Sequence, residues 1–377
     1  MVRLGIDLGG TNIAVGVVNE QNEIIGTASV KTMAPRPAEE IADSMREACL
    51  LALGEARMTL DDVASVGVGT PGAVNEEGVV EFSANLGFND TPLRDLVAER
   101  LGKPTYIEND ANCAALGEQI DGCGGGVPNF VAVTLGTGVG GGIILGGKIV
   151  AGSNGAAGEI GHMKVRENEL ETCGCGKKGC LEQYASATGV VRLAKRALTA
   201  APADETPLRK LEEVSAKDVF DYAKSGDEFS LAIVDEVGKM LGEAIAHINC
   251  VVDPEVVVFG GGVSKAGQIL LDAVEKYYKP AAFHAAREVD FKLAVLGNDA
   301  GMYGAVRMIL AKGSRLAPGP EPLQSAIQRA VLRSSSFFVR SAGAHLVLTR
   351  KCPPRPTVNR VFIPPDQHIL KKLVKTN

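Results

Sequence analysis

The densest group of potential metal ligands in this chain lies between residues 162 and 180. It comprises one histidine and three closely spaced cysteines: His162, Cys173, Cys175 and Cys180. Three thiolates and one imidazole complete a tetrahedral zinc shell, and the intervening glycines let so short a segment fold back around an ion. The pattern therefore predicts a closed, structural zinc site. Reduced surface thiols on a glycine-rich loop are the alternative.

Two glutamates, Glu159 and Glu182, bracket these four residues. A zinc ion would fix His162 and the start of the segment from Leu181 to Tyr184. It would thereby also fix the orientation of both carboxylates. We therefore expect the carboxylates of Glu159 and Glu182 to point towards a bound ligand.

Three glycine-containing turns are candidates for phosphate binding. They are Asp7-Leu8-Gly9-Gly10-Thr11, Leu135-Gly136-Thr137-Gly138 and Gly260-Gly261-Gly262. Each follows a predicted strand, so backbone N–H groups are exposed there, and without a Cβ the chain can approach phosphate oxygens closely. Ordinary hairpin geometry is the alternative for each turn taken alone. The spacing of Gly136, Gly138 and Gly141 also fits a dinucleotide fingerprint, but a β-rich run follows where that fingerprint needs a helix.

Hydrophobic periodicity predicts the same order of elements twice within residues 1–312. In the first half we expect strands at 2–8, 13–18, 23–30, 63–69 and 104–108 and helices at 38–53 and 92–101. In the second half we expect strands at 130–135, 141–145, 148–150, 255–259 and 291–296 and a long helix at 231–250. Two such halves facing each other would leave a cleft.

The composition is that of a globular protein. The chain has 377 residues, of which 45% are hydrophobic, and a formal net charge of −6. The length suffices for two domains with separate cores, and the negative charge excludes a general basic surface for nucleic acid. The N-terminus shows no targeting signal and no apolar run reaches membrane-spanning length, so we expect a cytoplasmic protein. Its eight cysteines are then expected to be thiols or metal ligands, not disulfides.

The charge is unevenly distributed along the chain. Residues 313–377 contain 11 Lys or Arg and 2 Asp or Glu, a net charge of +9, which leaves −15 for residues 1–312. This basic, Pro-rich tail shows no sustained helical or strand period, so we predict a poorly ordered, dispensable extension. An arm that binds nucleic acid or a protein partner is the alternative.

Four motifs in this order resemble those of the ROK family of sugar kinases and sugar-responsive repressors. They are residues 7–11, Glu108-Asn109-Asp110-Ala111-Asn112, Gly158-Glu159-Ile160-Gly161-His162, and the cysteine segment that ends in Gly179-Cys180-Leu181-Glu182. The resemblance spans residues 2–312 and is strongest to the family's bacterial glucokinases. It implies an actin-like ATPase fold, ribonuclease H-like and duplicated, with two α/β domains around a cleft. It also implies transfer of the γ-phosphoryl group of ATP to a sugar hydroxyl with Mg²⁺ present.

The domain organisation expected from this resemblance and from the repeat has three parts. Residues 1–118 form a smaller N-terminal α/β domain, completed by a helix near 301–312. Residues 119–300 form a larger α/β domain that carries the zinc-binding insertion, and residues 313–377 form the tail.

The resemblance also implies roles for particular residues. The sugar ligands would be Asn85, Asn109, Asp110, Glu159, His162 and Glu182. Asp7 would lie near Mg²⁺; Gly9, Gly10, Thr11, Gly136, Thr137 and Gly138 would line the phosphate path; and Gly261 and Gly262 would face the nucleoside. An exposed loop asparagine is the alternative for Asn85, and an aspartate in a turn after a strand is the alternative for Asp7.

Asp110 is the predicted general base. A sugar hydroxyl is a poor nucleophile, so a carboxylate must accept its proton as the P–O bond forms. Asp110 lies where a predicted strand meets a predicted helix, and its alternative role is the N-cap of the helix at 111–118. Asn109 offers an amide that donates and accepts, which suits vicinal hydroxyls. His162 could bind zinc through one ring nitrogen and a sugar hydroxyl through the other.

The predicted function is ATP-dependent phosphorylation of a hexose, with glucose converted to glucose 6-phosphate as the first choice. The alternatives are a non-catalytic, sugar-sensing transcriptional regulator and a kinase for another hexose or an N-acetylated amino sugar. Family repressors carry a helix-turn-helix segment before the first phosphate strand, and here that strand begins at Val2. We therefore expect no nucleic-acid partner, and the lack of a spanning apolar run predicts no membrane partner. The resemblance implies a homo-oligomer that binds a hexose and ATP.

Overall fold

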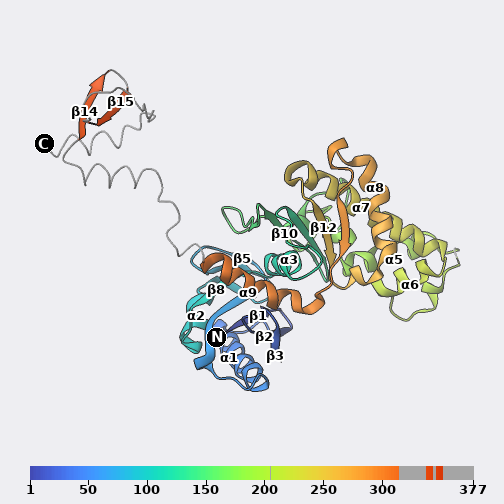
Figure 1. The fold of residues 1–377 in the computed structure, drawn as a ribbon. Coiled ribbons are helices and arrows are strands. Elements are labelled where there is room, and N and C mark those ends of the chain that lie inside the picture. The colour runs from blue at the N-terminus through green and yellow to red at the C-terminus, as the bar shows by residue number, and fades with distance from the viewer. Residues whose placement is uncertain (204, 314–336, 343–344, 351–377) are drawn as a thin grey trace. The chain divides into compact units, whose positions relative to one another are not determined.

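The computed structural model describes residues 1–203, 205–313, 337–342 and 345–350 (Figure 1). Contacts divide the chain into two compact units, Met1–Gly313 and Ser314–Asn377, and each is described by itself. The first unit contains two five-stranded sheets with identical strand order.

The first sheet has the order β3-β2-β1-β4-β8. Its strands are β1 (Val2–Leu8), β2 (Asn12–Val18), β3 (Ile24–Lys31), β4 (Val63–Thr70) and β8 (Thr105–Asn109). The three strands β1 to β3 are antiparallel, whereas β1, β4 and β8 run parallel. Helices α1 (Ala38–Glu55) and α2 (Leu93–Leu101) share a hydrophobic core with this sheet, because their apolar residues recur at spacings of three and four.

The second sheet repeats the pattern, with the order β11-β10-β9-β12-β13. Its strands are β9 (Phe130–Leu135), β10 (Val139–Leu145), β11 (Lys148–Ile149), β12 (Val256–Gly260) and β13 (Asp290–Leu293). The helices associated with it are α4 (Glu182–Ala185), α5 (Ala187–Ala200), α6 (Ala216–Lys224), α7 (Glu228–Val252) and α8 (Gln268–Ala281). Residues from these helices and strands form a second large core. The predicted internal repeat is therefore confirmed.

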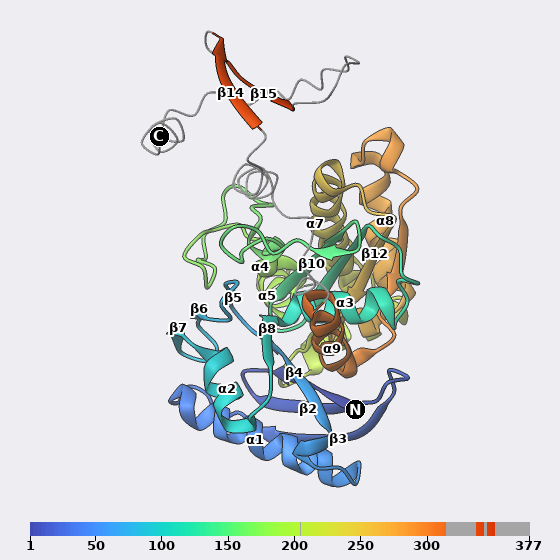
Figure 2. The same ribbon diagram turned by 60° about the vertical axis from the view of Figure 1, so that its left-hand side comes forward.

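Two further helices, α3 (Asp110–Ile120) and α9 (Ala300–Gly313), pack together between the two sheets (Figure 2). Glycines allow this close approach. A Cβ at Gly304 would lie 1.6 Å from the carbonyl oxygen of Cys113, and one at Gly67 of β4 would lie 2.1 Å from that of Ala305. The backbone of α9 thus rests directly on α3 and on the first sheet.

Short elements complete the first unit. A small antiparallel sheet contains β5 (Ala73–Val74), β6 (Val80–Ser83) and β7 (Phe88–Thr91). The 3₁₀ turns are Leu60–Asp62, Ile160–His162, Pro207–Lys210, Val263–Ala266, His284–Ala286 and Gly297–Asp299. This small sheet was not predicted, because strands of two to four residues are too short to show a period.

The second unit corrects one prediction about the tail. Strands β14 (Phe337–Ala342) and β15 (His345–Arg350) pair as an antiparallel hairpin, although no strand period was expected there. Each strand holds a short run of apolar and β-favouring residues that a longer window averages away. The rest of the tail, and with it the prediction of poor order, lies outside the described residues.

The expected boundaries at residues 118 and 300 stay predictions, since contacts group residues 1–313 into one unit. Among the described helices, none combines the length and apolarity needed to cross a lipid bilayer.

Candidate active site and metal cluster

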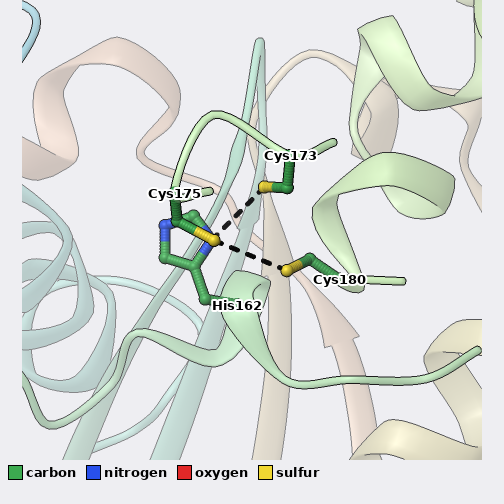
Figure 3. Close-up of side chains that lie close together, drawn as sticks. All are labelled: His162, Cys173, Cys175 and Cys180. Atoms are coloured by element: carbon green, nitrogen blue, oxygen red, sulfur yellow. Dashed lines mark hydrogen bonds between the residues drawn. The ribbon is translucent and has the colours of Figure 1, made fainter. Parts of the chain in front are cut away.

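The structure brings the four predicted metal ligands together (Figure 3). Their ligand atoms all lie within 4.8 Å of one another. Sγ of Cys175 is 3.6 Å from Sγ of Cys180, and Sγ of Cys173 is 3.8 Å from Nδ1 of His162. Donors bound tetrahedrally to one zinc ion, with Zn–S bonds near 2.3 Å, lie about 3.6 to 3.8 Å apart. The donor set and its spacing therefore fit zinc.

The loop around the cluster is shaped by backbone contacts. Gly179 has φ +79°, and a Cβ there would lie 1.9 Å from the carbonyl oxygen of Arg166. Gly176 also has a positive φ, and its N–H donates to the carbonyl of Cys173 at 2.8 Å. Only glycine fits at position 179, so the tight return of the chain depends on it.

The two predicted glutamates contact the cluster from opposite ends. Oε2 of Glu159 is 3.9 Å from Nε2 of His162, the ring nitrogen that does not face the cysteines. Oε1 of Glu182 lies 3.7 Å from Sγ of Cys173, and its Oε2 accepts a hydrogen bond of 3.1 Å from the N–H of Val139. Glu182 therefore joins the metal cluster to the glycine turn between β9 and β10.

The second and third glycine turns lie side by side. Gly261 has φ +85°, and a Cβ there would lie 2.6 Å from the carbonyl oxygen of Leu135, which precedes Gly136. The N–H of Gly136 donates to the carbonyl of Gly138 at 3.0 Å, and the hydroxyl of Thr188 donates to the carbonyl of Thr137 at 2.9 Å. Gly262 follows in the same exposed turn. The turn from Gly136 to Gly138 is thus held by α5 and presented next to Gly261.

The first glycine turn joins β1 to β2. The N–H of Gly9 donates to the carbonyl of Asn12 at 2.9 Å, and the hydroxyl of Thr32 donates to the carbonyl of Gly9 at 2.6 Å. A Cβ at Gly10 would lie 3.5 Å from Cβ of Asn85, so Asn85 lies beside this turn. The side chain of Thr11 is exposed.

Asp7 and Asp110 come together at one edge of the first sheet. Asp7 of β1 pairs with Gly69 of β4, and a Cβ at Gly69 would lie 3.5 Å from Cα of Asp110. Because β1, β4 and β8 are parallel, their carboxyl ends bring both aspartates to the same side. Gly69 lets the start of α3 approach β4 closely, since a Cβ there would also lie 3.2 Å from Cβ and Sγ of Cys113.

The carboxylates in this region influence one another. Burial raises the pKa of Asp7 to about 6, and the charge of Asp110 adds to the rise. Burial raises the pKa of Asp110 as well; the N–H of Ala111 opposes that rise and the charge of Glu159 adds to it. Asp7, Asp110 and Glu159 therefore form one acidic group, which is suited to binding a cation and accepting a proton.

Asn109, not Asp110, caps α3. Oδ1 of Asn109 accepts from the N–H of Asn112 at 3.1 Å, and its Nδ2 donates to the carbonyl of Gly72 at 3.1 Å. Asp110 is the first residue of the helix, and its Oδ1 accepts from the N–H of Ala111 at 2.8 Å. The alternative role considered for Asp110 is therefore wrong. The amide of Asn109 keeps one proton and one lone pair for a ligand.

One residue at this site escaped the sequence analysis. A Cβ at Gly301 would lie 2.7 Å from Oδ2 of Asp7, so the start of α9 rests directly against the acidic group. The repeat of glycine three residues later, at Gly304, is the signal that could have indicated close packing of this helix.

Two surface cavities lie away from this chemistry. One, of about 610 Å³, is lined by Glu171 and by α5 residues that include Arg192 and Arg196. The other, of about 710 Å³, is lined by residues 166–171 and Arg196. Neither lining includes a predicted site residue. The candidate active site is therefore assigned from its side chains and glycine turns and not from these two cavities.

Comparison with known proteins agrees with this arrangement. A family model described as ROK family matches residues 3–312. A glucokinase from Halalkalibacterium halodurans is 38% identical over 84% of this chain and 98% of its own length. A putative xylose repressor from Caldicellulosiruptor sp. is 32% identical over 82% of this chain and 78% of its own length. The crystal structure of a ROK family glucokinase from Streptomyces griseus in complex with glucose and AMPPNP is 37% identical, with a TM-score of 0.69, and the match covers 82% of this chain and 99% of that one.

Proposed function

This chain belongs to the ROK family, and from that membership we propose that it is a glucokinase that converts glucose and ATP to glucose 6-phosphate and ADP. The observation that carries the proposal is the position of Asp110. It lies at the junction of β8 and α3, with a raised pKa, in one acidic group with Asp7 and Glu159. A carboxylate with a raised pKa can accept the proton that the acceptor hydroxyl loses during phosphoryl transfer.

In the proposed reaction Asp110 is the general base. The sugar oxygen forms a bond to the γ-phosphorus as the bond from that phosphorus to the β–γ bridging oxygen breaks, and the hydroxyl proton passes to the carboxylate of Asp110. A raised pKa strengthens Asp110 as a base, since efficiency in proton transfer rises as the pKa approaches the working pH. The hydrogen bond from Ala111 holds the carboxylate in orientation.

The proposed sugar ligands besides Asp110 come from several elements. Glu159 and His162 come from the turn that follows Gly158, and Glu182 comes from the start of α4. Carboxylates accept hydrogen bonds from sugar hydroxyls, while Asn85 and the free capacity of Asn109 both donate and accept. His162 turns Nδ1 towards the cysteines and Nε2 towards Glu159, so it can serve the metal cluster and the sugar together.

The proposed nucleotide site consists of the three glycine turns. Gly9, Gly10 and Thr11 would meet the phosphates from one side and Gly136, Thr137 and Gly138 from the other, while Gly261 and Gly262 would face the nucleoside. Asp7 would lie near Mg²⁺, which would neutralise charge on the β- and γ-phosphates. Zn²⁺ held by His162, Cys173, Cys175 and Cys180 would have a structural role.

A coupled ADP-release assay with ATP, Mg²⁺ and a panel of sugars tests the function. We expect turnover with glucose above that with mannose, fructose and N-acetylglucosamine, and loss of turnover in an Asp110→Asn variant. Preference for N-acetylglucosamine would assign an amino-sugar kinase. Binding of glucose without turnover of any sugar would favour the regulator.

A further inference from the structure

A buried ion-pair cluster lies next to the metal loop, and the proposed reaction does not yet use it. Its centre is Glu169, whose side chain is 2% exposed. The carboxylate accepts from Arg196 at 2.6 and 3.0 Å, from Arg192 at 3.3 Å and from the hydroxyl of Tyr184. The N–H groups of Leu170 and Glu171 also donate to it, at 2.8 and 3.0 Å. So many donors hold this carboxylate in one position and lower the pKa of Glu169, with Arg196 as the largest cause.

Tyr184 is held on its faces as well as at its hydroxyl. Its ring is fully buried, and the guanidinium groups of Arg192 and Arg166 lie 5.1 and 5.4 Å from the ring centre. Cation–π contacts of this kind restrict the ring's position. The Glu169 cluster therefore fixes the hydroxyl of Tyr184, whose ring also packs in the second large core.

Tyr184 belongs to α4, a helix of four residues. One turn of helix is not stable alone, because a single turn orders several residues for very few hydrogen bonds. Other contacts must hold α4. Among them, the hydroxyl of Tyr184 donates to Glu169, Nη2 of Arg192 donates to the carbonyl of Gln183 at 2.6 Å, and Oε1 of Gln183 accepts from the N–H groups of Gly179 and Cys180 at 2.9 and 3.1 Å. The first residue of α4 is Glu182, the proposed sugar ligand.

The helix that supplies the two arginines also holds the phosphate turn. The N–H of Ala187 donates to the carbonyl of Gly136 at 2.8 Å, and the hydroxyl of Thr188 donates to that of Thr137 at 2.9 Å. One face of α5 thus carries both the turn proposed for phosphate and the anchor of α4. The rigid helix α5 therefore sets the distance between the turn from Gly136 to Gly138 and α4.

We infer that Glu169 and Tyr184 are positioning residues that fix the Glu182 carboxylate for sugar binding. Glu169 anchors the hydroxyl of Tyr184, Tyr184 sets the rotation of α4, and α4 directs Glu182 between Val139 and the sugar. The inference rests on the proposed function. It adds an anchor for Glu182 that is separate from the four metal ligands.

A Tyr184→Phe variant tests this, because it removes only the hydroxyl. We expect kcat/KM for glucose to fall about fivefold to tenfold, the size of one net hydrogen bond, because the remaining contacts of α4 hold Glu182 in part. Metal content per chain should equal that of the wild type. Glu169→Gln, which keeps the size of the side chain, should change kcat/KM in the same direction.

Tyr278→Phe is the matched control. Tyr278 is also fully buried, and its hydroxyl accepts from Nδ2 of Asn249 at 2.7 Å, but it lies in α8 and has no part in the site. It should lower the melting temperature and leave kcat/KM unchanged. A double-mutant cycle with Glu182→Gln measures the coupling between positions 184 and 182 in kcat/KM. A purely structural role of Tyr184 would give no such coupling. The effect of Tyr184→Phe should disappear when Glu182 is already altered.

The inference is overturned if Tyr184→Phe keeps kcat/KM within twofold of the wild type, if Tyr278→Phe lowers it equally, or if the two changes in the cycle are additive. A wild-type protein that fails to phosphorylate glucose would instead refute the proposed function. The same variants would then be compared by their dissociation constants for glucose, measured by calorimetry, with the same cycle deciding the inference.

Discussion

Replacing Gly301 by alanine would place a methyl group against the acidic group. A Cβ at this position would lie 2.7 Å from Cγ and Oδ2 of Asp7 and 3.1 Å from its Cβ. The optimal separation of such atoms is about 3.5 Å, so the overlap is roughly 0.8 Å. Moving α9 away would open its close backbone contacts with α3 at Gly304 and with β1 at Met302, and that costs more than turning one side chain. The carboxylate of Asp7 must move instead.

The contact distances permit an estimate of the loss in unfolding free energy and of the loss in turnover. Inserting a methyl group into a packed region of this kind costs about 1 to 3 kcal/mol of unfolding free energy. Moving a catalytic group by about 1 Å can lower turnover about 100-fold. We therefore expect Gly301→Ala to lower kcat by about 10- to 100-fold and to leave KM for glucose within about twofold, because the proposed sugar ligands lie on other elements.

The assay combines steady-state kinetics with urea unfolding, and Gly54→Ala in α1 is the matched control. Both glycines are helical, but a Cβ at Gly54 would meet nothing within 4 Å. The control should keep the kcat of the wild type, and its unfolding free energy should rise by up to about 1 kcal/mol because alanine has the higher helix propensity. If Gly301→Ala retained the kcat of the wild type, the position of Asp7 would not matter to turnover, and the reasoning would be refuted.

Three other predictions follow from the same site. Asp110→Asn should lower kcat by about 100-fold or more with little change in glucose affinity, measured kinetically and by calorimetry, and near-normal turnover would remove Asp110 as the base. Burial raises the pKa of Asp7 from 3.8 to about 6, so the metal-free folded protein binds more protons between these values than the unfolded chain. The contribution of Asp7 to stability should therefore fall by about 3 kcal/mol as pH rises from about 4 to above 6, measured as the difference between wild type and Asp7→Asn in urea unfolding, and parallel pH profiles of the two proteins would contradict this. Cys175→Ala should release zinc, lower the melting temperature and weaken glucose binding, and metal analysis that finds no zinc in active wild-type protein would contradict the coupling.

The sequence by itself was sufficient for the chain order of the strands in the two five-stranded sheets and for the grouping of three cysteines with a histidine. Both are local properties: apolar spacing reports which face of a segment is buried, and three cysteines within eight residues must lie close together wherever the segment goes. The repeat of strands and helices, the turns at Gly9 and Gly136, and the grouping of His162 with the cysteines were all predicted in this way. Asp110, the alternative N-cap considered for α3, lies one residue after the observed cap, Asn109, and asparagine and aspartate are nearly equal as caps.

Only the tertiary structure decided which distant residues meet. The parallel register of β1, β4 and β8 places Asp7 and Asp110 on either side of Gly69, and no spacing in the sequence encodes that register. The contact of Gly301 with Asp7 depends on how α9 crosses the first sheet, and the cluster at Glu169 depends on α5 folding back over the metal loop. Such contacts follow from the packing of whole helices and sheets, which buries far more surface than any single pair of residues and so sets their geometry.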